Sequence, residues 1–271
     1  MATKEEVKRY WQENPLLSHE LGDLGSASFF SELDRAKRED SDIFAMGYWE
    51  FGAFAGKRLL DVGCGPGWVA MNYALGGARV CAMDLTFRAA QLSKAHLKLR
   101  EARADVIEAD AESIPFRDGS FDVVVSSGVL HHTPDTPRAI GECHRVLKSG
   151  GIAKLTFYHK GILHHPVVFG FTRFVMNLFS VKHPGADLSK DAMDVDDFIR
   201  QYDGAANPVG IGMTTGQWRT VLRDAGFRVT GSELHFFPKR FIPLGRFIPR
   251  LVHRALDRLL GTMIYFHLEK P

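Results

Sequence analysis

Cysteine is scarce in this chain of 271 residues. The three thiols, Cys64, Cys81 and Cys143, are too scattered for a zinc-binding pattern or a disulfide framework, so we expect no metal site. Excess charge of one sign is also missing, since 34 Lys and Arg residues balance 32 Asp and Glu residues. This balance gives no indication of a nucleic-acid partner. Because the thiols form no disulfide framework, a reducing cytoplasm is the simplest location for the protein.

Long hydrophobic runs are absent as well. No run is long and apolar enough to span a bilayer, and the first residues, MATKEEVKRY, are charged where a signal peptide would be apolar. A hydrophobic content of 45% is ordinary for a globular protein. A chain of this length can bury one large core, so we expect one domain with insertions.

The most informative segment runs from Leu59 to Gly67, with the sequence LLDVGCGPG. An apolar strand ends in an acid, and glycines follow at alternate positions, where the backbone can turn with positive φ and admit a ligand closely. A helix expected over residues 68–75 would point its free N–H groups at an anion or a carboxylate. Trp68 stands where a dinucleotide motif needs glycine, and no Gly-Lys-Ser/Thr follows. Asp61 would repel a pyrophosphate but could hold an ammonium group.

Further strands and helices alternate after this turn. We expect strands over residues 78–84, around 106–107, over 121–127 and over 152–158, and a last strand within 261–271. Helices are expected between them. One of these covers residues 136–146, with Thr136 and Pro137 as its cap and first turn and with Gly150 and Gly151 ending it. This alternation predicts a doubly wound α/β sheet with its ligand at the carboxyl ends of the strands.

The string DVGCGPG resembles motif I of the class I S-adenosylmethionine-dependent methyltransferases, and the resemblance covers residues 57–158. It implies a Rossmann-like, seven-stranded sheet, mostly parallel with an antiparallel last strand, and helices on both faces. S-adenosyl-L-methionine is the implied cofactor. Asp84 would hold the ribose and Asp110 the adenine amino group. The complete set of cofactor-binding residues that we expect is Asp61, Gly63, Cys64, Gly65, Gly67, Asp84, Leu85, Asp110, Ala111, Ser127, Tyr10 and Trp11.

Residues 1–56 are expected to form a helical cap or lid, and residues 57–271 the methyltransferase domain. The string WxxNP from Trp11 to Pro15 resembles an N-terminal extension that folds over the cofactor in one branch of the family. Aromatic rings suit a sulfonium cation, so Tyr10 or Trp11 could contact it. The alternative is that most of the many aromatic residues before the first strand simply cover the sheet.

Two insertions are expected, at about 160–213 and 238–260. The first carries an apolar helix predicted to begin at Pro166, which suits a lid, a dimer face or a lipid-facing surface. Its segment from Tyr202 to Pro208 resembles a stretch found in methyltransferases of small or lipid-like molecules, and Thr214 with Gln217 forms a capping box for the next helix. The second carries a basic amphipathic helix after Pro249, which is either a membrane-surface element or an ordinary solvated face.

The candidate catalytic residues are His131, His159 and Tyr158, which follow or end the fourth and fifth strands. A neutral imidazole could remove a proton from an acceptor near pH 7. We expect in-line methyl transfer to a small or lipid-like, partly apolar acceptor, without a nucleic-acid partner. Peripheral membrane contact and a homodimer stay open, as do a non-catalytic cofactor-binding protein and a methyltransferase of a protein, peptide or nucleic acid.

Overall fold

A computed structural model describes residues 2–18, 21–41, 43–165, 167–170, 194–237, 239 and 245–271. The predicted helix that begins at Pro166 lies mostly outside these residues. The strands of the sheet are β1 (Arg58–Val62), β2 (Arg79–Asp84), β3 (Ala104–Glu108), β4 (Phe121–Ser127), β5 (Leu147–His159), β6 (Gly212–Met213), β7 (Arg228–His235) and β8 (Met263–Glu269). The described α-helices are α1 (Lys4–Glu13), α2 (Ala27–Ala36), α3 (Met46–Trp49), α4 (Trp68–Leu75), α5 (Phe87–Leu99), α6 (Thr136–Val146), α8 (Val195–Arg200), α9 (Thr215–Asp224) and α10 (Arg250–Leu260).

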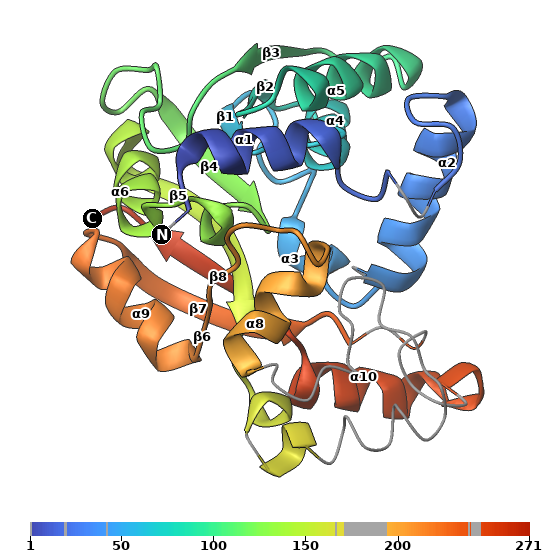
Figure 1. Cartoon of the computed structure of the whole chain (residues 1–271). Helices are drawn as coiled ribbons and strands as arrows, with labels where there is room; N and C mark the ends of the chain where they lie inside the picture. Colours follow the sequence, from blue (N-terminus) through green and yellow to red (C-terminus); the bar gives the residue numbers. More distant parts are fainter. Residues whose placement is uncertain are drawn as a thin grey trace.

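The strands follow the order β3-β2-β1-β4-β5-β8-β7, and the short β6 pairs with β5 (Figure 1). Pairs among β1 to β5 are parallel, whereas β8 runs antiparallel to both β5 and β7. The predicted mostly parallel sheet with an antiparallel last strand is therefore confirmed. The sheet has one strand more than the seven expected, because Gly212 and Met213, which precede α9, form the short β6 that pairs with the end of β5.

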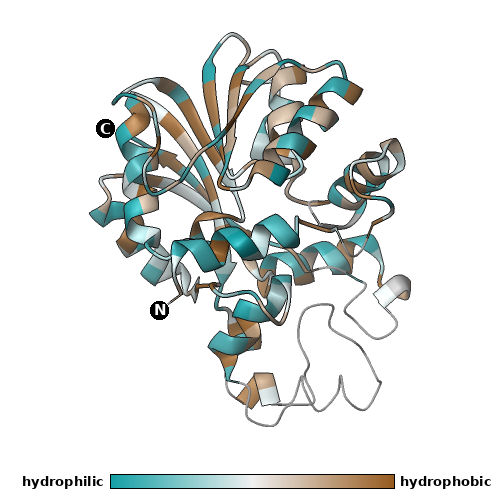
Figure 2. Ribbon diagram, turned by 45° about the horizontal axis from the view of Figure 1, so that its top comes forward, coloured by the Kyte–Doolittle hydropathy of each residue, from teal (hydrophilic) through white to brown (hydrophobic). Residues whose placement is uncertain are grey.

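Each face of the sheet is covered by helices, as the alternation of strands and helices predicted. Alternate residues of the parallel strands, such as Leu59 and Leu60 of β1, enter separate hydrophobic clusters. One cluster includes α4, α5 and the aromatic residues of α2 and α3, and the other includes α6 and α9. Figure 2 shows hydrophobic residues along the central strands, which are buried on both sides.

The aromatic residues before β1 mainly build this core. The side chains of Phe29, Phe30, Tyr48 and Trp49 are at most 2% exposed. They pack in the cluster that covers one face of the sheet, and the Tyr48 hydroxyl donates to the backbone carbonyl of Phe266 at 2.8 Å. For these four rings the structure supports the second interpretation, in which they cover the sheet, rather than contact with a sulfonium.

Two details of the connection between β4 and β5 differ from the sequence prediction. The carboxylate of Asp135, not Thr136, caps α6 by accepting the Arg138 N–H at 3.1 Å. Aspartate is a strong capping residue, and Thr136 and Pro137, which follow it, begin the first helical turn. Gly150 and Gly151 lie within β5 rather than closing the helix. The boundaries of β4 and α6 themselves are as predicted.

Candidate cofactor and acceptor site

The turn after β1 contains two glycines that packing requires and one that faces open space. Gly63, Gly65 and Gly67 have φ values of 76°, 49° and 84°. An added Cβ would lie 2.3 Å from Cγ1 of Val129 at Gly63, and 2.6 Å from Oγ of Ser93 at Gly67. At Gly65 it would meet no atom within 4 Å. The backbone at Gly65 is therefore open to a ligand.

Helix α4 begins directly after this turn, as predicted. Its N-cap is Gly67, and no described side chain caps its first N–H groups. These groups and the positive end of the helix dipole are available to a carboxylate.

Asp61 has a buried carboxylate with unsatisfied oxygens. The residue is 1% exposed, and neither side-chain oxygen accepts a hydrogen bond of ordinary geometry in the described chain, although the Ala70 amide is close enough to affect its pKa. Burial raises the pKa of this carboxyl to about 7, against the opposing effect of the Ala70 amide and with a smaller contribution from Asp84. An ionised carboxylate in this environment needs a cation, and an ammonium group would supply both charge and hydrogen bonds.

Asp84 lies beside the glycine turn, where a ribose-binding acid was predicted. Its Oδ2 accepts the Gly65 N–H at 3.0 Å, and its Oδ1 accepts the N–H and the hydroxyl of Thr86, both at 3.0 Å. Burial raises the pKa of Asp84 despite these bonds. A carboxylate has about four acceptor positions, so one remains for a hydroxyl group. The half-buried Leu85 follows directly.

The N-terminal helix α1 reaches the loop after β3, where the adenine-binding residue was predicted. Lys4 Nζ lies 2.5 Å from Oδ2 of Asp110 and 2.8 Å from Oε2 of Glu112. Hydrogen bonds to these two carboxylates raise the pKa of Lys4. The buried Ala111 lies between them in sequence. The structure thus places α1 against the predicted adenine edge (Figure 1).

A polar cluster forms where β4 and β5 end. Oδ2 of Asp203 accepts a hydrogen bond from the Tyr158 hydroxyl and lies 3.1 Å from Nε2 of His132. The Tyr10 hydroxyl donates to the backbone carbonyl of Asp203, and the Trp11 ring packs edge-on against His132 at a centroid distance of 5.1 Å. Burial would raise the pKa of Asp203, but its bonds to His132 and Tyr158 lower it below the ordinary value.

His132 has an oxygen atom near each ring nitrogen. Nδ1 lies 2.6 Å from the carbonyl oxygen of Val209, which can only accept, and Nε2 faces the Asp203 carboxylate. The Nδ2 amide of Asn207 also lies 3.4 Å from Nδ1. The ring of His132 is thus positioned between the loop that carries Asn207 and Val209 and the carboxylate of Asp203.

His131 has the opposite environment. It is completely buried, neither ring nitrogen has a hydrogen-bond partner in the described chain, and its ring lies 4.1 Å from that of Tyr158. Burial, with a smaller effect of the neighbouring His132, lowers the pKa of His131 well below its usual value. His131 is therefore neutral at pH 7. Val129, two residues earlier, packs against Gly63, which joins this cluster to the glycine turn.

His159 is held by the protein on both sides of its ring. Nδ1 lies 3.3 Å from the carbonyl oxygen of Gly261, and Nε2 lies 3.3 Å from the hydroxyl of Thr215. Successive strand residues point to opposite faces, so its side chain leaves β5 on the other side from Tyr158. Burial lowers its pKa. Its proposed role as a base stays a prediction that these contacts do not favour.

Most of the predicted site residues lie at this one edge of the sheet. Ser127 ends β4 there, and the buried Cys64 lies in the glycine turn, where burial raises the pKa of its thiol well above the usual value. Sequence analysis did not identify Asp203 or Asn207, although both lie in the segment YDGAANP that it singled out. Asn207 is fully buried, and its Nδ2 donates to the carbonyl of Arg200 at 2.9 Å.

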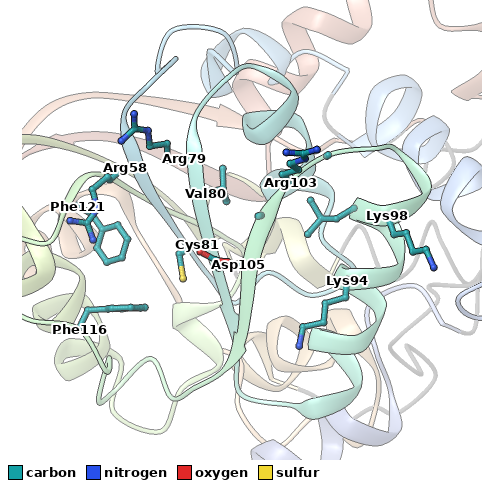
Figure 3. A pocket seen from close by; sticks show the side chains of 13 residues that line it. Arg58, Arg79, Val80, Cys81, Lys94, Lys98, Arg103, Asp105, Phe116 and Phe121 are labelled. Carbon is teal, nitrogen blue, oxygen red and sulfur yellow. The ribbon is translucent and has the colours of Figure 1, made fainter.

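A cavity of about 680 Å³ lies at the opposite, amino-terminal ends of the strands (Figure 3). Arg58, Arg79 and Arg103 line it, at the starts of β1 and β2 and just before β3. It is separate from the glycine turn and the histidines. Among the described residues no group of three or more histidine, cysteine or acidic side chains could hold a metal ion. None of the described helices is long and apolar enough to cross a membrane.

Comparison with known proteins agrees with this architecture. Residues 60–155 match a family model described as a methyltransferase domain. A ubiquinone biosynthesis O-methyltransferase of Ralstonia nicotianae is 30% identical over 166 residues, which are 61% of this chain and 66% of that protein. A protein of the same name from Aromatoleum aromaticum is 35% identical over 98 residues, 36% of this chain and only 42% of its own length.

A solved structure from Bacillus halodurans, named as a methyltransferase, has a TM-score of 0.57 at 20% identity, with 84% of this chain and 99% of that chain covered. At this identity the likeness concerns the fold. The family model, the curated relatives and the fold agree with the glycine turn and the acids around it. The chain therefore belongs to the class I S-adenosylmethionine-dependent methyltransferases, whose cofactor is S-adenosylmethionine.

Proposed function

We propose that this protein transfers the methyl group of S-adenosylmethionine to a hydroxyl group of a small or lipid-like, partly apolar acceptor. The observation that carries the proposal is the neutral, unpartnered His131 beside the His132–Asp203 pair, at the edge that also holds the glycine turn. The matched relatives from Ralstonia and Aromatoleum are named as O-methyltransferases, which supports oxygen as the acceptor atom.

The residues around the glycine turn fit the cofactor. The open backbone at Gly65 and the uncapped start of α4 would take its carboxylate, and the orphaned Asp61 its ammonium group. Asp84 would accept from the ribose and Asp110 from the adenine amino group. When bound, the cofactor supplies a methyl group on a sulfonium, which is a good leaving group.

The protein must then align the acceptor, exclude water and receive a proton. His131 is the residue that we assign to the last task, because its neutral ring has a nitrogen available to accept. Burial, with a smaller effect of His132, lowers the pKa of His131, while the Val209 carbonyl and the Asp203 carboxylate position the ring of His132 beside it. Tyr158 packs on His131 and orients Asp203, which makes it a positioning residue in this scheme.

Residues 1–56 include the element that would close the site. Helix α1 bonds to the predicted adenine loop through Lys4 and to the acceptor cluster through Tyr10 and Trp11. His131 has no exposed surface, and α1 contacts its neighbours His132 and Asp203. We therefore propose that α1 opens for exchange of ligands and closes for transfer. A homodimer and a cytoplasmic location stay predictions.

A panel of alkylated phenols, alcohols, thiols and amines tests the proposal, with S-adenosylhomocysteine release and the mass and position of the new methyl group as the readouts. We expect O-methylation of an amphipathic phenol or alcohol. His131→Asn should reduce kcat by about 10²- to 10⁴-fold with little change in cofactor affinity. Loss of turnover in His159→Asn with full turnover in His131→Asn would show that the base is assigned wrongly. Methylation of tRNA or of a protein, and none of the small acceptors, would refute the acceptor class.

A further inference from the structure

Helix α10 has two polar side chains facing inward and three aliphatic side chains facing outward. His253 and Asp257 are only 4% and 3% exposed. Leu251, Val252 and Leu259 are 83%, 50% and 69% exposed, respectively. An ordinary surface helix shows the reverse pattern.

Specific bonds fix this orientation. Oδ2 of Asp257 lies 2.6 Å from Nδ1 of His235, at the end of β7, and its Oδ1 accepts the Phe237 N–H at 3.0 Å. Nε2 of His253 donates to the Phe237 carbonyl at 2.8 Å. Rotating α10 to bury its leucines would break these bonds and leave a buried carboxylate unpaired, which is costly. The outward aliphatic stripe is thus imposed by the polar anchors.

Cations flank this stripe. Arg250, Arg254 and Arg258 recur every four residues, so they lie along one side of the helix, and all three are exposed. None of them takes part in an ion pair with another described residue. The one acid of α10 is the buried Asp257. The outer side of α10 therefore combines three exposed aliphatic residues with three positive charges and no negative charge.

We propose that this side of α10 binds the surface of an anionic phospholipid bilayer. Aliphatic side chains of such a helix enter the boundary between headgroups and acyl chains, and arginines beside them meet the lipid phosphates. A second copy of the chain fits less well. A twofold contact through this side would bring two sets of arginines together without an acid on either side to pair with them.

Docking through α10 would bring the acceptor edge of the sheet close to the lipid. The helix ends before Gly261, whose carbonyl lies 3.3 Å from Nδ1 of His159 at the end of β5. Tyr158 of the acceptor cluster precedes His159. The proposal goes beyond the methyl transfer proposed above and does not depend on it, since binding is measured without an acceptor.

Cosedimentation with vesicles tests the proposal. The full chain should bind vesicles of phosphatidylcholine with phosphatidylglycerol, bind vesicles of phosphatidylcholine alone much less, and be released by salt. Changing Arg250, Arg254 and Arg258 together to Gln should weaken binding to the anionic vesicles about a hundredfold, since each charge near such a surface contributes about fivefold.

Two further variants distinguish docking through α10 from a general attraction between positive charge and the vesicles. The triple change of Arg58, Arg79 and Arg103 to Gln removes the same charge at the cavity of Figure 3, and binding should stay within about twofold. Leu251→Gln with Leu259→Gln keeps every charge but should weaken binding about tenfold or more. These leucines are exposed, so the melting temperature should be unchanged.

Three results would overturn the proposal. One is vesicle binding that neither α10 variant changes, and another is equal loss of binding in the two arginine triples. The third is a dimer in sedimentation equilibrium that Leu251→Gln with Leu259→Gln dissociates, because the apolar side would then be covered by a second copy.

Discussion

The buried Asp61 carboxyl should make cofactor binding depend on pH. Its pKa is raised from 3.8 to about 7 by burial, so near neutral pH the ligand-free protein holds this group about half protonated. An ammonium group that binds there favours the ionised form. Binding should therefore release a proton below pH 7, and affinity for S-adenosylhomocysteine should rise with pH.

The magnitude follows from the shift. With a pKa of about 7 in the free protein, the ionised fraction falls about tenfold between pH 8 and pH 6, and the affinity should fall about tenfold with it. The same shift affects the stability of the free protein. A carboxyl whose folded pKa is raised destabilises the fold increasingly as pH rises from about 4 to 7. The full penalty, up to about 4 kcal/mol, is present above that range.

Calorimetry with S-adenosylhomocysteine, in pairs of buffers with different ionisation heats, measures both the affinity and the released proton. Asp61→Asn should bind about 10- to 100-fold more weakly at pH 8, because a charge-assisted bond is lost, and its affinity should not change between pH 6 and pH 8. The free variant should melt at a higher temperature than the wild type at pH 8. Asp224→Asn, at the exposed end of α9, is the matched control and should behave as the wild type. Equal proton release in wild type and Asp61→Asn would refute this role for Asp61.

The remaining predictions concern Asp203, the glycine turn and α1. The pKa of Asp203 is lowered in the fold, so its contribution to stability is present above the ordinary carboxyl range and lost as pH falls through the folded pKa. Asp203→Asn should therefore lower the melting temperature at pH 7, and much less near pH 3; an equal effect at both pH values would contradict this account. Gly65→Ala should remain folded, at a cost of about 1 kcal/mol for its positive φ, but should bind S-adenosylhomocysteine poorly. Gly63→Ala should not fold, because its Cβ would overlap Val129. Identical melting curves for these two variants would be inconsistent with this packing. Deleting residues 1–16 should leave a normal melting transition with much weaker cofactor retention and little turnover, and full activity or complete unfolding would show that the segment is not a lid.

The sequence predicted the parts of the fold that depend on local pattern. The limits of β4 and α6 follow from hydrophobic runs and from the punctuation around them, and the capping box of Thr214 with Gln217 is present at the start of α9. The glycine turn was predictable for the same reason. Positive φ at alternate positions leaves a clear signature in the sequence, and the acids near the ends of β1 and β2, Asp61 and Asp84, lie next to it.

The acceptor cluster was only partly predictable because it depends on contacts far apart in the chain. Asp203 is more than forty residues from Tyr158 and more than seventy from His132, and its loop gave no local sign that it would return to the ends of β4 and β5. The prediction therefore considered His131, His159 and Tyr158 without the carboxylate that holds two side chains of the cluster. The different surroundings of His132, which faces this carboxylate, and of His131, which has no partner in the described chain, also depend on it.

The orientation of α10 shows the limit of periodicity in another way. The pattern of arginines and aliphatic residues predicted an amphipathic helix, and the helix is present. Periodicity gives the two sides of a helix but not the side that faces the protein, which is usually inferred from hydrophobicity alone. Here His253 and Asp257 have partners at the end of β7, and the gain from satisfying a buried ion pair and two backbone groups decides the orientation. The aliphatic side is left outward, and only the tertiary structure turns an ordinary amphipathic pattern into a candidate membrane surface.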